Sequence, residues 1–252
     1  TASMATSQNG TNGTQDAGIS ALNATGFTVD HVASTVGRTN ESGKTYYWYA
    51  FGGAAIQTGT YTGNGTSKAT TGLGAIVMAW VIPTSLSNTA VLWRNTNMTT
   101  TSMNMGTTAG QTDEITSLDA DGFTVGASTF VNTNGSTYHY IGFSSDSNLV
   151  VGTYAGDGTD DRNLPASAMA FDPSTVTIKA DAGQAACWKG SSLAGDASLE
   201  YGSLASAANK IQSLTPVAGK FQVGTDNKVN SSILTYYFWA TTTAAGGGAA
   251  WL

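Results

Sequence analysis

The feature that most constrains this chain is that it repeats itself. Three segments align, and their first residues lie 96 positions apart: ISALNATGFTV (19–29), ITSLDADGFTV (115–125) and IQSLTPVAGKFQVG (211–224). A loop rich in glycine and asparagine follows each of them, and then an aromatic segment: GKTYYWYAF (43–51), GSTYHYIGF (135–143) or ILTYYFWA (233–240). Self-similarity at a fixed period indicates a structural unit that is used more than once.

A second set of matches occurs only twice. GTYTGNGT (59–66) matches GTYAGDGT (152–159), and AVLWRN (90–95) matches AACWKG (185–190). The unit is therefore about 95 residues long. Eight residues mark the aligned structural positions: Phe27, Phe123, Phe221, Tyr46, Tyr138, Tyr236, Trp93 and Trp188.

These matches divide the chain into four parts. Residues 58–147 and 150–240 are each predicted to form a complete unit, and residues 241–252 a flexible tail. Residues 1–53 carry only the back half of a unit. We expect its front half to come from an upstream segment or from another chain.

The residue pattern within the unit favours strands. GAIVMAWVI (74–82) is continuously apolar, as in a strand that is covered on both faces, whereas TYHYIGF (137–143) alternates. Clusters of Gly, Asn, Asp and Ser separate these runs, and no segment shows a convincing amphipathic helix. The sequence therefore predicts an all-β protein of tandem antiparallel β-sandwich repeats, with two full units and one half unit.

Composition excludes several classes of function. Charged residues make up 10% of the chain and the net charge is −6, so the chain has no basic cluster for nucleic acid. No apolar run is long enough to span a bilayer, and the one cysteine, Cys187, cannot form an internal disulfide. Cys187 matches Leu92, which predicts a small buried apolar side chain rather than a nucleophile.

Two acidic turns are candidate metal sites. Asp119 and Asp121 precede a glycine, as in the start of a calcium loop, and Asp157, Asp160 and Asp161 lie close together in GDGTDDR. The aligned copies do not keep these carboxylates, which favours ordinary turns over ion binding. We therefore expect neither a metal nor another cofactor.

Catalysis is not expected either. The chain has only two histidines, His31 and His139, which are too few for a three-histidine zinc site. A pair of carboxylates in a cleft would be needed for a polysaccharide-degrading enzyme, and sequence alone gives no distance between carboxylates. Exposed aromatic rings could instead stack on sugars, so a carbohydrate-binding adhesin or receptor-binding module is the alternative function.

The combination of GTYTGNGT as the opening segment with SLDADGFTVG and VNTNGSTYHYIGF as the closing segments resembles a repeat module of tailed-bacteriophage structural proteins. Residues 58–147 resemble it most, residues 150–240 lack its Asp-Gly-Phe triplet, and residues 16–51 match only its closing half. The resemblance implies a sandwich similar to the concanavalin-like group and a virion protein, either a capsid decoration or a tail or fibre component. It also implies partners among other virion proteins and copies of the same chain, with surface glycans as the partner in the alternative, and no catalytic residues.

Overall fold

A computed structural model of the chain describes residues 19–23, 26–29, 42–43, 45–48, 50–83, 91–201 and 206–242. The described residues form antiparallel strands, the loops between them and two four-residue helices. The predicted all-β class is confirmed. None of the helices in the described part is long and apolar enough to cross a membrane. His31 and nearly all of the predicted tail (241–252) lie outside the described residues.

The first sandwich consists of a five-stranded and a three-stranded sheet. The larger sheet has the order β3-β10-β5-β6-β7 and the smaller one the order β4-β9-β8. Their elements are β3 (Ile56–Thr62), β4 (Lys68–Thr71), β5 (Ile76–Pro83), β6 (Leu92–Asn95), β7 (Met103–Asn104), β8 (Ile115–Asp119), β9 (Gly122–Val125), α1 (Thr129–Asn132) and β10 (Thr137–Ser144).

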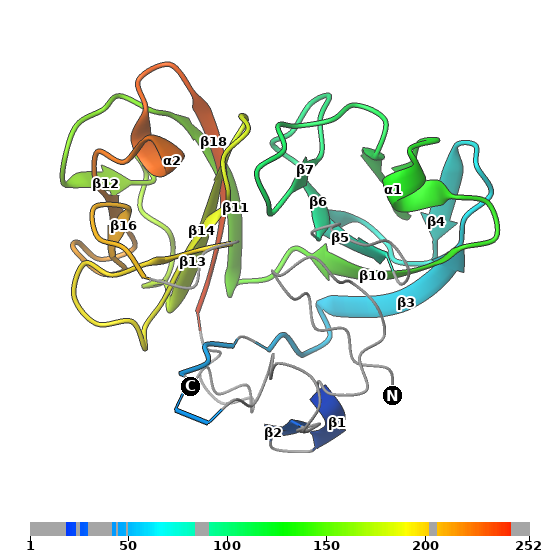
Figure 1. Cartoon of the computed structure of the whole chain (residues 1–252), viewed down its shortest axis with the longest axis horizontal. Helices are drawn as coiled ribbons and strands as arrows, with labels where there is room; N and C mark the ends of the chain where they lie inside the picture. The colour runs from blue at the N-terminus through cyan, green and yellow to red at the C-terminus, as the bar shows by residue number, and fades with distance from the viewer. Residues whose placement is uncertain are drawn as a thin grey trace.

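The second sandwich has the same strand order. Its larger sheet runs β11-β18-β13-β14-β15 and its smaller one β12-β17-β16, and the two sandwiches lie side by side in Figure 1. Their elements are β11 (Leu149–Ala155), β12 (Arg162–Leu164), β13 (Thr175–Ala180), β14 (Cys187–Gly190), β15 (Leu199–Glu200), β16 (Ile211–Ser213), β17 (Phe221–Val223), α2 (Asn227–Asn230) and β18 (Thr235–Thr241). The predicted unit boundaries themselves stay a prediction.

The aligned tyrosines occupy matching positions in the two larger sheets. Tyr138 lies opposite Tyr61 on β3, and the two rings stack with centroids 5.2 Å apart. Tyr236 lies opposite Tyr154 on β11, with a centroid distance of 5.1 Å. A stacked cross-strand aromatic pair stabilises the sheet beyond the area that it buries.

Each sandwich encloses its own apolar core. In the first core, Phe123 of β9 lies between the sheets with Ile115, Val125 and Tyr138, and all four are buried. In the second core, Phe221 takes the corresponding place. Cys187 also lies in this core and Leu92 in the first, as predicted, and burial raises the pKa of the Cys187 thiol to about 12.

A third apolar cluster joins the two larger sheets. Trp80, Trp93, Met103 and Phe143 from the first sandwich contribute to it, together with Trp239 from the second. Trp93 and Trp188 hold the same place in the strand order, on β6 and β14. Their surroundings differ, because Trp93 contacts Trp239 whereas Trp188 lies 6.1 Å from the Tyr47 ring. Both rings lie outside the sandwich cores.

The N-terminal region contributes a separate hairpin. β1 (Ile19–Asn23) pairs with β2 (Gly26–Val29), and in the described part of the chain these two strands make a two-stranded sheet. In Figure 1 the hairpin lies apart from both sandwiches, at the bottom of the view. Its register, Leu22 opposite Phe27 and Ile19 opposite Val29, is that of Leu118 and Phe123, and of Ile115 and Val125, in the β8–β9 hairpin.

Candidate functional site

The motif Gly-Thr-Tyr-x-Gly opens both sandwiches, and its glycines and its tyrosine have packing roles. A β-carbon on Gly59 would lie 2.4 Å from the hydroxyl of Tyr140, and one on Gly152 would lie 2.4 Å from the Phe238 ring. The glycine therefore makes room for the ring on the neighbouring strand. The second glycine of the motif, Gly63 or Gly156, does the same for a backbone carbonyl in the loop after the helix.

The tyrosine hydroxyls hold the short helices in place. Tyr61 donates to the carbonyl of Val131 at 2.6 Å, and Tyr154 donates to the carbonyl of Val229 at 2.5 Å. Burial raises the pKa of the Tyr61 hydroxyl well above its usual range. A hydroxyl that stays protonated and donates to a buried carbonyl is a structural group, not a proton-transfer group.

A buried asparagine ends each helix and ties it to the loop between the first two strands of its sandwich. The Asn132 amide donates to the carbonyls of Thr66 and Gly126, and its oxygen accepts from the Asn64 N–H. Asn230 donates to the carbonyl of Thr159 and accepts from the Asp157 N–H. These asparagines escaped the sequence prediction, although both end the sequence Val-Asn in the aligned segments.

The first acidic turn uses its carboxylates within the fold. Ser117 and Thr124 each donate a hydroxyl to Asp119 at 2.7 Å. The Asp121 carboxylate accepts the N–H groups of Gly74 at 2.9 Å and Gly72 at 3.0 Å, and these bonds lower its pKa. Both carboxylates therefore stabilise turns.

The second acidic turn has the same character. Asp157 accepts from the hydroxyl and the N–H of Thr159 and forms an ion pair with Arg162 at 3.1 Å, and the Thr159 hydroxyl is the largest cause of its lowered pKa. Asp160 accepts from the Gln212 amide, and the carbonyl of Asp161 accepts from Gln222. Within the described ranges, no group of three or more His, Cys, Asp and Glu residues is arranged to hold a metal ion.

Two buried cations order the loops that follow β6 and β14. The Arg94 guanidinium donates to the carbonyls of Thr101 and Thr99 at 2.8 and 2.9 Å, and also to that of Ile115. At the aligned position, the Lys189 ammonium donates to the carbonyls of Leu193, Gly195 and Ala197. Backbone carbonyls thus satisfy the charge in both sandwiches.

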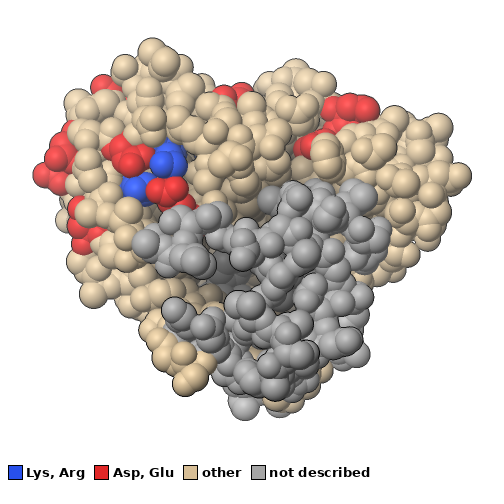
Figure 2. Space-filling model, viewed as in Figure 1, with Lys and Arg blue, Asp and Glu red and all other residues tan. Residues whose placement is uncertain are grey.

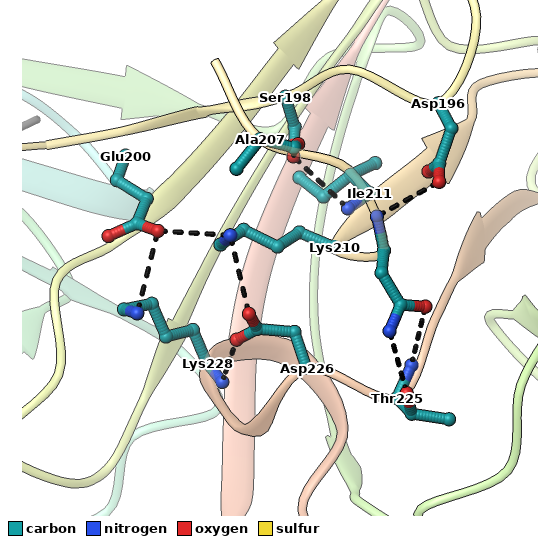
Figure 3. Close-up of polar contacts among 10 residues, drawn as sticks. Asp196, Ser198, Glu200, Ala207, Lys210, Ile211, Thr225, Asp226 and Lys228 are labelled. Carbon is teal, nitrogen blue, oxygen red and sulfur yellow. Dashed lines mark hydrogen bonds and ion pairs between the residues drawn. The ribbon is translucent and has the colours of Figure 1, made fainter. Parts of the chain in front are cut away.

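One position carries opposite charges in the two sandwiches. Lys210 forms ion pairs with Glu200 at 3.0 Å and with Asp226 at 3.3 Å, and Lys228 also reaches Glu200 (Figure 3). On the face shown in Figure 2, the visible basic side chains gather at one place over the second sandwich, beside acidic ones. Burial would lower the pKa of Lys210, but the hydrogen bond to Glu200 and the charge of Asp226 raise it.

The aligned residue in the first sandwich is Glu114, which is buried. It accepts a hydrogen bond from the Ser102 hydroxyl at 3.2 Å, and burial raises its pKa to about 7. Ionisation of this buried carboxyl therefore costs the fold free energy.

The apolar face of the β1–β2 hairpin is less buried than the equivalent faces of the other two hairpins. Ile19, Phe27 and Val29 are only half-buried, whereas their counterparts in the β8–β9 and β16–β17 hairpins are fully buried. Leu22 is 71% exposed, while the aligned Leu214 is buried. This face is therefore the candidate assembly surface.

Exposed aromatic rings do not recur in the two sandwiches. Phe130 is exposed in the first, and the aligned residue in the second is Lys228. Tyr46 and Tyr47 are also exposed, at 39% and 41%, but the aligned Tyr236 and Tyr237 are buried. A row of rings at equivalent places, which sugar stacking would require, is thus not found in the described part of the chain. Comparison of the chain with protein-family models, with curated proteins and with solved structures gave no match.

Proposed function

We propose that this chain is a non-enzymatic structural protein of a phage particle, a capsid decoration or a tail or fibre component, which works by assembly and docking. The observation that carries the assembly role is the β1–β2 hairpin, where Leu22 is exposed and Ile19, Phe27 and Val29 are only half-buried. Contiguous exposed apolar surface on a soluble protein marks an interaction site.

The roles of the polar side chains support a structural protein. The two acidic turns, the buried cations and the buried asparagines all bind backbone groups or neighbouring side chains of the same sandwich. Polar groups that are occupied in this way rigidify a scaffold. The assignment to a phage particle rests on the sequence resemblance.

The assembly role is tested by placing a charge on the hairpin face. Leu22→Asp should abolish attachment to the particle, because an ionised carboxylate cannot be buried without a partner. Attachment is measured by co-sedimentation of the purified chain with particles and by electron microscopy of particles labelled with an antibody against it.

Ile233→Asp is the matched control, because Ile233 is an equally apolar side chain that is 87% exposed on the second sandwich. Attachment that survives Leu22→Asp, or that is lost equally with Ile233→Asp, would show that the hairpin face is not the assembly surface.

A further inference from the structure

The β1–β2 hairpin makes the same ring contact with residues 45–48 that the hairpins of the complete sandwiches make with their aromatic strands, although residues 45–48 are not in a strand. Phe27 meets Trp48 edge to face with centroids 4.9 Å apart and an interplanar angle of 82°. The aligned pairs are arranged alike: Phe123 and Tyr140 at 5.5 Å and 69°, and Phe221 and Phe238 at 5.1 Å and 68°. The hairpin is therefore positioned against its aromatic segment as in the complete sandwiches.

In the complete sandwiches, a strand from the front half covers the outer edge of the hairpin. β4 pairs with β9, and β12 pairs with β17. The Thr70 carbonyl of β4 comes so close to Gly122 that a β-carbon there would lie 2.0 Å from it. At the aligned Gly26 of β2, a β-carbon would meet no described atom within 4 Å.

The edge of β2 carries neither a charge nor a proline, and the bulge of this hairpin lies between Ile19 and Ala21 of β1. Residues 19–29 contain no charged residue and no proline. Natural edge strands are usually protected by charges, prolines or bulges that prevent pairing with another chain. An uncharged edge beside a half-open apolar face is suited to β-augmentation.

We propose that this N-terminal half unit is the acceptor for a strand of another polypeptide that carries the pattern Gly-Thr-Tyr-x-Gly followed by a short second strand. The chain itself shows twice which sequence fills this place, in β3–β4 and in β11–β12. In the donor, the first glycine would lie over Trp48 as Gly59 lies over Tyr140, and the tyrosine would lie opposite Tyr46. This inference rests on the proposed assembly function and specifies its partner.

Neither residues 1–44 nor the two complete sandwiches supply the donor strand. Tyr46 is the first tyrosine in the sequence, so residues 1–44 contain no copy of the pattern. The two copies that the chain does contain are each paired along their length within their own sandwich, β3 with β10 and β11 with β18. A second copy of this chain would have to open one of its own sandwiches to donate a strand.

The test uses a synthetic peptide of residues 56–71, IQTGTYTGNGTSKATT, with the full chain. We expect saturable binding, together with a slowing of amide hydrogen exchange by about tenfold or more in residues 26–29 and 45–48. A peptide of residues 115–125, which belongs to the back half, should not bind. The proposal is wrong if the 56–71 peptide does not bind, or if it slows exchange only elsewhere in the chain.

A matched pair of glycine variants identifies the bound edge. Gly26→Ala should weaken peptide binding at least about tenfold, because its methyl group occupies the place of the donor carbonyl. Gly52→Ala, also in open space, should leave binding unchanged. Equal binding to both variants would overturn the proposal. So would a concentration-dependent dimer that protects residues 26–29 without peptide, because a second copy would then be the occupant.

The two hypotheses can fail separately. Loss of particle attachment in Leu22→Asp together with no peptide binding would retain the assembly role and reject this donor strand.

Discussion

The indole of Trp93 on β6 meets the indole of Trp239 on β18 at a centroid distance of 4.8 Å and an interplanar angle of 73°, and this pair joins the two larger sheets. Trp80 also contacts Trp239, at 5.4 Å. Because Trp93 and Trp239 are both fully buried, the contact between the sandwiches resembles a protein core rather than a loose domain contact.

Trp239→Ala should therefore lower the free energy of unfolding by about 3–5 kcal/mol, through lost burial and a cavity between the sheets. Urea denaturation monitored by circular dichroism measures this change. Phe130→Ala, at a half-exposed ring, should change stability by less than about 0.5 kcal/mol. Equal effects of the two substitutions would show that the aromatic cluster does not join the sheets.

Arg94 and Lys189 should be interchangeable, because each donates only to backbone carbonyls. Arg94→Lys is expected to cost less than about 1.5 kcal/mol, whereas Arg94→Met leaves buried carbonyls without a donor and should cost about 2–5 kcal/mol. Thermal denaturation of the two variants measures the difference. A Met variant as stable as the Lys variant would contradict the role of the charge.

Glu114 should make the stability depend on pH. Its folded-state pKa of about 7 lies above the ordinary value of 4.5, so its favourable contribution is complete below pH 4.5 and is lost as the pH rises to about 7. Glu114→Gln keeps an acceptor for Ser102 and should be more stable than the parent by up to about 3 kcal/mol above pH 7, with little difference at pH 4. Urea denaturation at a series of pH values measures this, with Asp146→Asn at an exposed turn as the control. A constant difference across the pH range would rule out the titration.

Gly122 and Gly26 should respond differently to alanine. Gly122 has a φ of 139° and faces the Thr70 carbonyl, so Gly122→Ala combines backbone strain with a collision and should cost about 3 kcal/mol or more. Gly26→Ala should change stability by less than about 0.5 kcal/mol in the isolated chain. Thermal denaturation of both variants tests this, and a large loss in Gly26→Ala would show that the edge of β2 is already covered.

Calcium should not stabilise the protein, because Asp119 and Asp121 already accept hydrogen bonds within their turn. If such a site existed, calcium at 100 times its dissociation constant would raise the free energy of unfolding by about 2.7 kcal/mol. Differential scanning calorimetry with millimolar calcium, and after removal of metals with EDTA, should give the same midpoint. A rise with calcium would restore the acidic turns as ion sites.

Four of the aligned aromatic positions lie in the sandwich cores. Phe123, Phe221, Tyr138 and Tyr236 all lie in the sandwich cores, because strand alternation places every second side chain on the same face of a sheet. The same alignment explained why Asp119 and Asp121 are turn residues, since the other copies lack carboxylates there.

The polar interior was harder to predict. Arg94, Lys179 and Asn132 read as ordinary surface residues in the sequence, yet each is buried and donates to backbone carbonyls. Burial of the Lys179 ammonium lowers its pKa to about 8. These partners come from loops that are distant in sequence or irregular in conformation, so no local pattern marks them.

By itself, the sequence determined the all-β class and the side chains that face each core, because both follow from local alternation and from the recurrence of the same segments. Only the tertiary structure decided that Trp93 meets Trp239 while Trp188 lies near Tyr47. Identical positions in aligned strands acquired different neighbours because the outer face of each sheet is covered by another part of the chain, and that packing depends on contacts between segments far apart in sequence.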